Sequence, residues 1–126
     1  MPCHKCIEFR QGSFFLLDRY CVSPDSNKSA GTITIWHKDV PVWLMNYGGW
    51  YDKCAIPVVK EALMRAYEEK MFFGGRGWNM HKKNGIIYVN IPEKNAFPDF
   101  SGSEQAVELE TSRLLGYHDY WGITLI

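Results

Sequence analysis

The sequence predicts an α+β fold in which a mainly antiparallel sheet packs on one central helix. Several short stretches rich in β-branched and aromatic residues lie between turn signals, whereas only residues 58–72 repeat apolar residues with a helical period. With 126 residues, 46% of them hydrophobic, the chain can bury one core of ordinary size but not two. Residues 1–11 are polar and precede Gly12, so we expect a flexible N-terminal arm and then a single domain over residues 12–126.

Six strands are expected, three before the helix and three after it. Two-residue turns are expected at Asn84-Gly85, which has a favoured turn sequence, and at Lys38-Asp39, whose sequence is a weaker turn signal than Asn-Gly. The segment from Pro92 to Pro98 is rich in turn residues and is expected to be a loop. The expected strands are residues 13–20, 31–37, 41–50, 85–91, 103–110 and 113–120.

The helix is expected over residues 58–72. Pro57 suits a first helical turn, because the N–H group that it lacks would have no partner there. Gly74-Gly75 is expected to stop the helix, and the glycine-rich segment 73–79 is then a tight turn, because it lacks the spacing of a phosphate-binding loop. The expected buried face consists of Val59, Ala62, Leu63, Ala66 and Tyr67.

A weak internal similarity relates the two groups of strands. Gly12 and Gly85 are 73 residues apart, and so are Tyr47 and Tyr120, in similar successions of strands, loops and turns. The expected architecture is therefore a curled six-stranded sheet or half-barrel, built from two similar three-strand units and packed on the helix.

The charge balance argues against several classes of partner. Lysine plus arginine and aspartate plus glutamate both number 14, so no net field attracts nucleic acid or an anionic membrane surface. The sequence has no secretory signal and no apolar run of ~18 residues that could span a bilayer. We expect a cytoplasmic protein with reduced cysteines, no membrane association and no nucleic-acid partner.

Three short motifs resemble those of the domain of unknown function 5680 family. They are Pro-x-Trp-x-Met-Asn-Tyr-x-Gly over residues 41–49, Arg76-Gly77, and Phe-x-Gly-x-Glu over residues 100–104. Trp78 stands where the family has proline after Arg-Gly, and residues 1–11 are too short for the family's long N-terminal helix. The resemblance spans about residues 12–122 and implies a shared fold and pocket. It implies no activity, although members occur alone or behind small helix-turn-helix regulators.

Polar residues of these motifs form the candidate ligand site. An amide, a phenol, a cation and a carboxylate could converge in a cleft walled by aromatic rings and recognise a small molecule. Alternatively, Arg76 and Glu104 form a structural ion pair and Asn46 satisfies a buried backbone group. The candidate ligand-binding residues are Trp43, Asn46, Tyr47, Arg76, Trp78 and Glu104.

Metal binding and catalysis have weaker support. Cys3 and Cys6 have the spacing of half a zinc site, but no second pair of ligands follows at a suitable spacing. Cys54 lies near the helix start, where a thiol pKa is lowered, yet no histidine is fixed beside it. His118 and Asp119 would point to opposite faces of a strand. We therefore expect no catalytic residue, metal site or cofactor.

Our leading interpretation is a non-catalytic module that binds or senses a small molecule. One alternative is a protein-interaction or inhibitory domain, for instance a homodimer, that uses exposed aromatic residues. The other is a small hydrolase or transferase that uses a histidine or cysteine.

Overall fold

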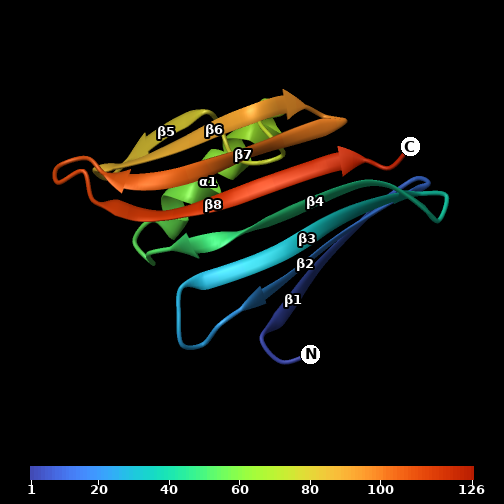
Figure 1. Ribbon diagram of the computed structural model, residues 1–126, viewed down its shortest axis with the longest axis horizontal. Coiled ribbons are helices and arrows are strands. Elements are labelled where there is room, and N and C mark those ends of the chain that lie inside the picture. Colours follow the sequence, from blue (N-terminus) through green and yellow to red (C-terminus); the bar gives the residue numbers. More distant parts are fainter.

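The computed structural model describes residues 1–126 as eight strands and one helix (Figure 1). The first four strands are β1 (His4–Gln11), β2 (Phe14–Val22), β3 (Lys28–His37) and β4 (Val40–Tyr51), followed by helix α1 (Ile56–Glu68). The last four are β5 (Met80–Lys83), β6 (Ile86–Ala96), β7 (Asp99–Glu108) and β8 (Leu114–Thr124). The helix is not long and apolar enough to cross a membrane.

All eight strands form one open antiparallel sheet in the order β1-β2-β3-β4-β8-β7-β6-β5. The prediction of an α+β fold with one helix and an antiparallel sheet is confirmed. The predicted number of six strands is wrong, and the sheet does not close, because β1 and β5 are free edges on opposite sides (Figure 1).

The two strands that we missed carry little hydrophobic pattern. Residues 4–11, expected to be an arm outside the sheet, form β1, whose ladder with β2 runs from His4 opposite Cys21 to Gln11 opposite Phe14. Strand β5 is only four residues long. Both are edge strands held mainly by backbone hydrogen bonds to one neighbouring strand. Backbone hydrogen bonds do not require a regular alternation of apolar and polar side chains, so the sequence pattern did not indicate these strands.

The segment 92–98 is also strand rather than loop over most of its length. Strand β6 passes through Pro92 with an irregularity between Pro92 and Lys94, and it continues to Ala96 before the turn into β7. A proline that would break a regular ladder is tolerated at such a bulge. The prediction of a loop from the turn residues of segment 92–98 is therefore wrong, because the bulge accommodates these residues within the strand.

The two halves of the chain form equivalent meanders of four strands, rather than the three-strand units predicted. In each meander the strands run in chain order from an outer edge of the sheet, β1 or β5, to its centre. There β4 of the first meander pairs with β8 of the second. In this central pair Tyr47 lies opposite Tyr120, the residue that the internal similarity makes its counterpart. Gly12 and Gly85 occupy the equivalent first hairpins, both with positive φ.

Helix α1 begins and ends earlier than predicted. Pro57 lies in its first turn as expected, but the last helical residue is Glu68, and Lys70 adopts a left-handed φ of 54° before the two glycines are reached. Its buried face consists of Val58, Val59, Ala62 and Ala66, with Leu63 partly buried and Tyr67 exposed.

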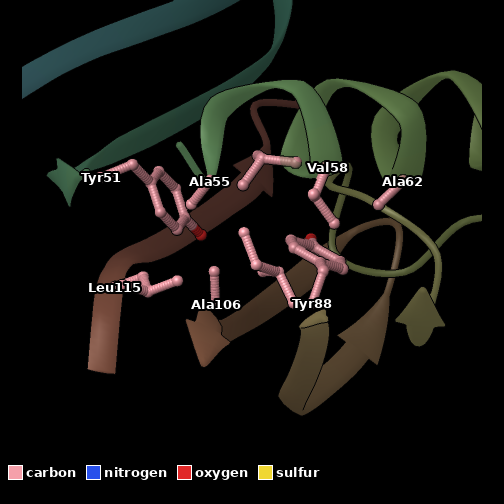
Figure 2. Close-up of a cluster of buried hydrophobic side chains, with 9 residues drawn as sticks. Tyr51, Ala55, Val58, Ala62, Tyr88, Ala106 and Leu115 are labelled. Atoms are coloured by element: carbon pink, nitrogen blue, oxygen red, sulfur yellow. The ribbon is translucent and has the colours of Figure 1, made fainter. Parts of the chain in front are cut away.

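The helix packs on the second meander and on Tyr51 at the end of β4. Small side chains at Ala55, Ala62 and Ala106 let α1 lie close to the sheet, where it encloses Tyr88 and Leu115 (Figure 2). We call the face of the sheet under α1 the inner face and the opposite one the outer face. The inner face of β1–β3 extends beyond the helix, and Ile7 on β1 remains 54% exposed there.

Candidate functional site

The glycine-rich segment after α1 lies flat on the inner face and delivers Arg76 to it. A Cβ atom on Gly74 would come within 2.1 Å of the Tyr120 ring, and one on Gly77 within 2.6 Å of the Tyr88 hydroxyl. Only glycine permits this approach. The segment is therefore more than a helix stop, because its glycines bring a guanidinium group into contact with the sheet.

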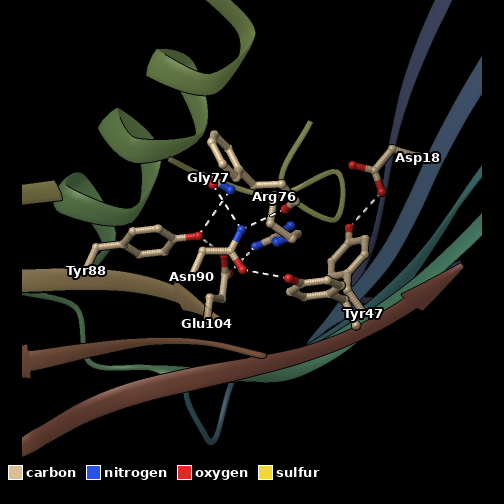
Figure 3. Close-up of polar contacts among 9 residues, drawn as sticks. Asp18, Tyr47, Arg76, Gly77, Tyr88, Asn90 and Glu104 are labelled. Carbon is tan, nitrogen blue, oxygen red and sulfur yellow. Dashed lines mark hydrogen bonds and ion pairs between the residues drawn. The ribbon is translucent and has the colours of Figure 1, made fainter. Parts of the chain in front are cut away.

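Side chains of the second meander hold this segment in place. The Asn90 amide Nδ2 donates to the carbonyl oxygens of Phe73, at 2.7 Å, and Gly77, at 3.0 Å. The Gly77 N–H donates to the Tyr88 hydroxyl at 3.1 Å, and the Gly74 N–H donates to Asn95 Oδ1 at 2.9 Å. These bonds fix the backbone on both sides of Arg76 (Figure 3).

Arg76 and Glu104 form a buried ion pair at the centre of the network. The Nη2 atom of Arg76 lies 2.5 Å from Oε1 of Glu104, whose side chain is 0% exposed, and the Tyr88 hydroxyl donates to Oε2 (Figure 3). Burial by itself would raise the pKa of Glu104, but the charge of Arg76 and the hydrogen bonds from Arg76 and Tyr88 outweigh it and hold that pKa below its ordinary value. Glu104 is therefore a carboxylate, as the structural ion-pair interpretation required.

On the first meander, Tyr47 reaches across the sheet to Asp18. Gly31 lies between them on β3, where a Cβ atom would come within 2.7 Å of the Tyr47 hydroxyl. Through this gap the hydroxyl donates to Oδ1 of Asp18 at 2.7 Å (Figure 3). The second meander repeats the arrangement, because Tyr120 lies against Gly102 and donates to Oδ1 of Asn90 at 2.6 Å.

A cavity of about 410 Å³ separates α1 from the inner face of the first meander. Apolar side chains line it from both elements, Ile7 from β1 and Ile56 and Leu63 from the helix, and Lys60 also lines it. Its polar lining includes Asp18, Tyr20, Tyr47, Tyr51, Arg76 and His118. The size and the mixture of apolar walls with a few polar groups are typical of small-molecule sites.

His118 is a buried neutral histidine in this cavity. Its ring stacks on Tyr51, with centroids 4.9 Å apart, and its Nδ1 atom has no hydrogen-bond partner in the protein. Burial and the nearby charge of Arg76 lower the pKa of His118 to about 4, against the attraction of Glu104. At neutral pH it can therefore donate or accept one hydrogen bond without carrying charge.

We expect NMR titration of the His118 ring protons to give a midpoint near pH 4. Because the unfolded chain would bind this proton near pH 6.5 and the folded chain near pH 4, stability should fall as the pH is lowered through that window. A His118→Gln variant should lose that part of the pH dependence. A midpoint for His118 near its ordinary value of 6.5 would contradict the prediction.

The family comparison covers most of this framework. A family model described as "Domain of unknown function (DUF5680)" matches residues 24–122. The chain belongs to the DUF5680 family. The matched range includes Tyr47, Arg76 and Glu104 but not β1, β2 or Asp18. No curated protein and no solved structure matches this DUF5680 chain.

The predicted site residues of this DUF5680 domain divide into three groups. Tyr47 and Arg76 line the cavity, and Glu104 lies directly behind Arg76. Asn46 points to the outer face, where it accepts a hydrogen bond from Thr32 at 2.8 Å. The two tryptophans lie elsewhere: Trp43 donates to the Phe97 carbonyl at 3.1 Å, and Trp78 packs under the Arg65 guanidinium.

Sequence reasoning missed Asp18, Tyr51 and His118 as lining residues of the DUF5680 cavity. Tyr51 lies four residues after Tyr47 on β4, so period-2 alternation places both on the inner face. Asp18 corresponds to Asn90 only in the structure, where each accepts the hydrogen bond of a tyrosine hydroxyl from the central pair of strands. His118 was set aside for its position next to Asp119, and the two do point to opposite faces, with His118 buried and Asp119 exposed.

The alternative chemical groups of the DUF5680 chain do not assemble into sites. Cys54 precedes α1, but the hydrogen bond and charge of Asp52 raise its thiol pKa, the opposite of the effect expected for a helix start. Cys6 lies 3.8 Å from His4 Nδ1, yet no three histidine, cysteine or acidic residues come together as a metal site. A larger hollow of about 590 Å³ over Gly48 is shallow and has no buried charged group among its lining residues.

Proposed function

We propose that this DUF5680 domain binds, or senses, a small amphipathic molecule in the cavity between α1 and the first meander. The observation that carries the proposal is the lining of the cavity, which combines the apolar side chains of Ile7 and Leu63 with the polar side chains of Arg76 and His118. Apolar walls with a few placed polar groups are typical of small-molecule sites. The polar side chains of the lining would orient a ligand while its apolar part packs on Ile7 and Leu63.

The rigidity of the floor supports the same proposal. Arg76 is fixed by Glu104, by the backbone bonds around it and by contact with Tyr47, whose ring centroid is 5.1 Å from its guanidinium carbon. A preorganised site loses little conformational entropy when a ligand binds. The apolar wall is open on one side, because Ile7 and Ile56 are 54% and 38% exposed. A small molecule can therefore reach the floor without displacing the helix.

The neutral fluorescent probe N-phenyl-1-naphthylamine tests the proposal. We expect its emission to rise on binding to the purified chain, and Ile7→Trp to weaken binding by at least about tenfold, because an indole at this position fills the cavity mouth. Ile91→Trp is the matched control, since Ile91 is 52% exposed on the outer face. No emission change, or equal binding by the Ile7 variant, would refute the proposal. Substitution of Arg76 does not test ligand binding alone, because it leaves the buried Glu104 carboxylate without its cationic partner and so also destabilises the fold.

A further inference from the structure

The cavity contains one carboxylate that has no cationic partner. Asp18 accepts a hydrogen bond from the neutral Tyr47 hydroxyl, but no lysine, arginine or histidine nitrogen lies within 4.0 Å of it. Its side chain is partly buried on the inner face of β2. Burial raises the pKa of Asp18, against the opposing effects of Tyr47 and the more distant Arg76, so this anion is held at a cost that a cation beside it would remove.

Neither of the two positive charges of the lining, Arg76 and Lys60, strongly favours binding of an anion. Arg76 is already neutralised by Glu104, which is fully buried and bonded to it at 2.5 Å. An anionic ligand would have to compete with that carboxylate. Lys60 lies on the exposed face of α1, where water screens its ammonium group. The charge within the cavity that most lacks a partner is therefore negative.

Aromatic rings flank the same carboxylate. Tyr20 on β2 and Tyr47 on β4 lie on either side of Gly31, where a Cβ atom would meet the Tyr20 Cβ at 2.6 Å and the Tyr47 hydroxyl at 2.7 Å. Faces of tyrosine rings attract cations, and the Tyr47 ring already lies beside the Arg76 guanidinium. A carboxylate with tyrosine rings beside it is a suitable environment for an alkylammonium group that is weakly hydrated.

We propose that the ligand of this cavity is an organic cation, with its ammonium group beside Asp18, Tyr20 and Tyr47 and its apolar body between Ile7 and Leu63. The inference rests on the proposed function, since it names the class of molecule that the same cavity binds. It also gives Asp18 and Gly31 a role: Gly31 opens the gap through which Tyr47 orients the carboxylate.

Three probes of nearly equal shape test the sign of the charge. They are 3-(trimethylammonio)phenol, its uncharged counterpart 3-tert-butylphenol, and the anion 3-hydroxybenzenesulfonate, each titrated against the chain loaded with N-phenyl-1-naphthylamine. We expect the cation to bind about tenfold more tightly than the uncharged phenol, and the sulfonate to bind most weakly. In Asp18→Asn, which keeps the side-chain shape and an acceptor for Tyr47, the preference for the cation should disappear. Asp119→Asn, on the outer face of β8, should keep it.

The possible failures are distinguishable from failure of the proposed function. If the uncharged phenol or the sulfonate binds best, or if Asp18→Asn keeps the preference for the cation, the inference about charge is wrong while small-molecule binding stands. If none of the three displaces the naphthylamine from a cavity that holds it, the inference is also overturned. The proposal that the cavity binds a small molecule fails only if the naphthylamine does not bind or if the Ile7→Trp variant binds it equally well.

Discussion

Replacing Glu104 by glutamine should lower the free energy of unfolding by about 3–5 kcal/mol, a large fraction of the stability of a domain of this size. Glu104 is 0% exposed and accepts hydrogen bonds from both Arg76 and Tyr88. Glutamine has nearly the same shape, but it leaves the Arg76 guanidinium as an unpaired charge in the interior. Urea denaturation followed by circular dichroism measures the loss directly.

A double variant separates the charge effect from the packing effect. In Glu104→Gln with Arg76→Met both charges are removed, so we expect much of the stability lost in the single variant to return. Asp99→Asn removes one partner of the exposed Lys94–Asp99 pair, both side chains of which are 61% exposed, and should leave the denaturation midpoint unchanged within error. A Glu104→Gln protein as stable as the wild type would contradict the buried ion pair.

Replacing Gly49 by alanine should be similarly damaging, at about 2–6 kcal/mol, for a reason unrelated to charge. Gly49 has a φ of 156°, which side-chain-bearing residues rarely adopt. A Cβ atom at this position would lie 1.9 Å from the carbonyl oxygen of Tyr117 on the adjacent strand β8. The substitution therefore forces apart the central pair of strands, β4 and β8.

Gly12→Ala is the matched control for the backbone effect. Gly12 also has a positive φ, of 59°, but no atom lies within 4 Å of its would-be Cβ. Its substitution should cost only the conformational strain, about 1–2 kcal/mol. Equal losses for the two variants, measured by thermal unfolding, would show that the contact with Tyr117 is not what requires glycine at position 49.

The parts of the fold that were predicted correctly are those in which burial of one face produces a regular pattern of apolar side chains. Strand β4 alternates because its two faces differ, and α1 has an apolar stripe because only one side is buried. At the hairpin turns Lys38-Asp39 and Asn84-Gly85 all four residues adopt positive φ, which aspartate, asparagine and glycine tolerate better than other residues. Such local signals can be read from the chain alone.

The candidate site was predicted only in part because its residues are brought together by register. Alternation along β4 puts Asn46 and Tyr47 on opposite faces, so both could not have reached the same cavity. Asp18 meets Tyr47 only because β3 lies between their strands with a glycine at the crossing. The spacing of residues along the sequence does not reveal the order of the strands in the sheet, and Asp18 was missed for this reason. Arg76 and Glu104 were found because they belong to short motifs.

The uneven coverage of the sheet means that its eight strands form one ladder but not one cooperative unit of stability. The second meander is closed over by α1, whereas β1 pairs with β2 alone, and Ile7 and Phe9 on it are 54% and 57% exposed. Local opening of β1 breaks only its hydrogen bonds to β2 and exposes little new apolar surface, so it needs far less free energy than global unfolding. The part of the wall that carries Ile7 can therefore open while the Arg76–Glu104 floor remains intact, so the cavity has a mobile entrance above a fixed base.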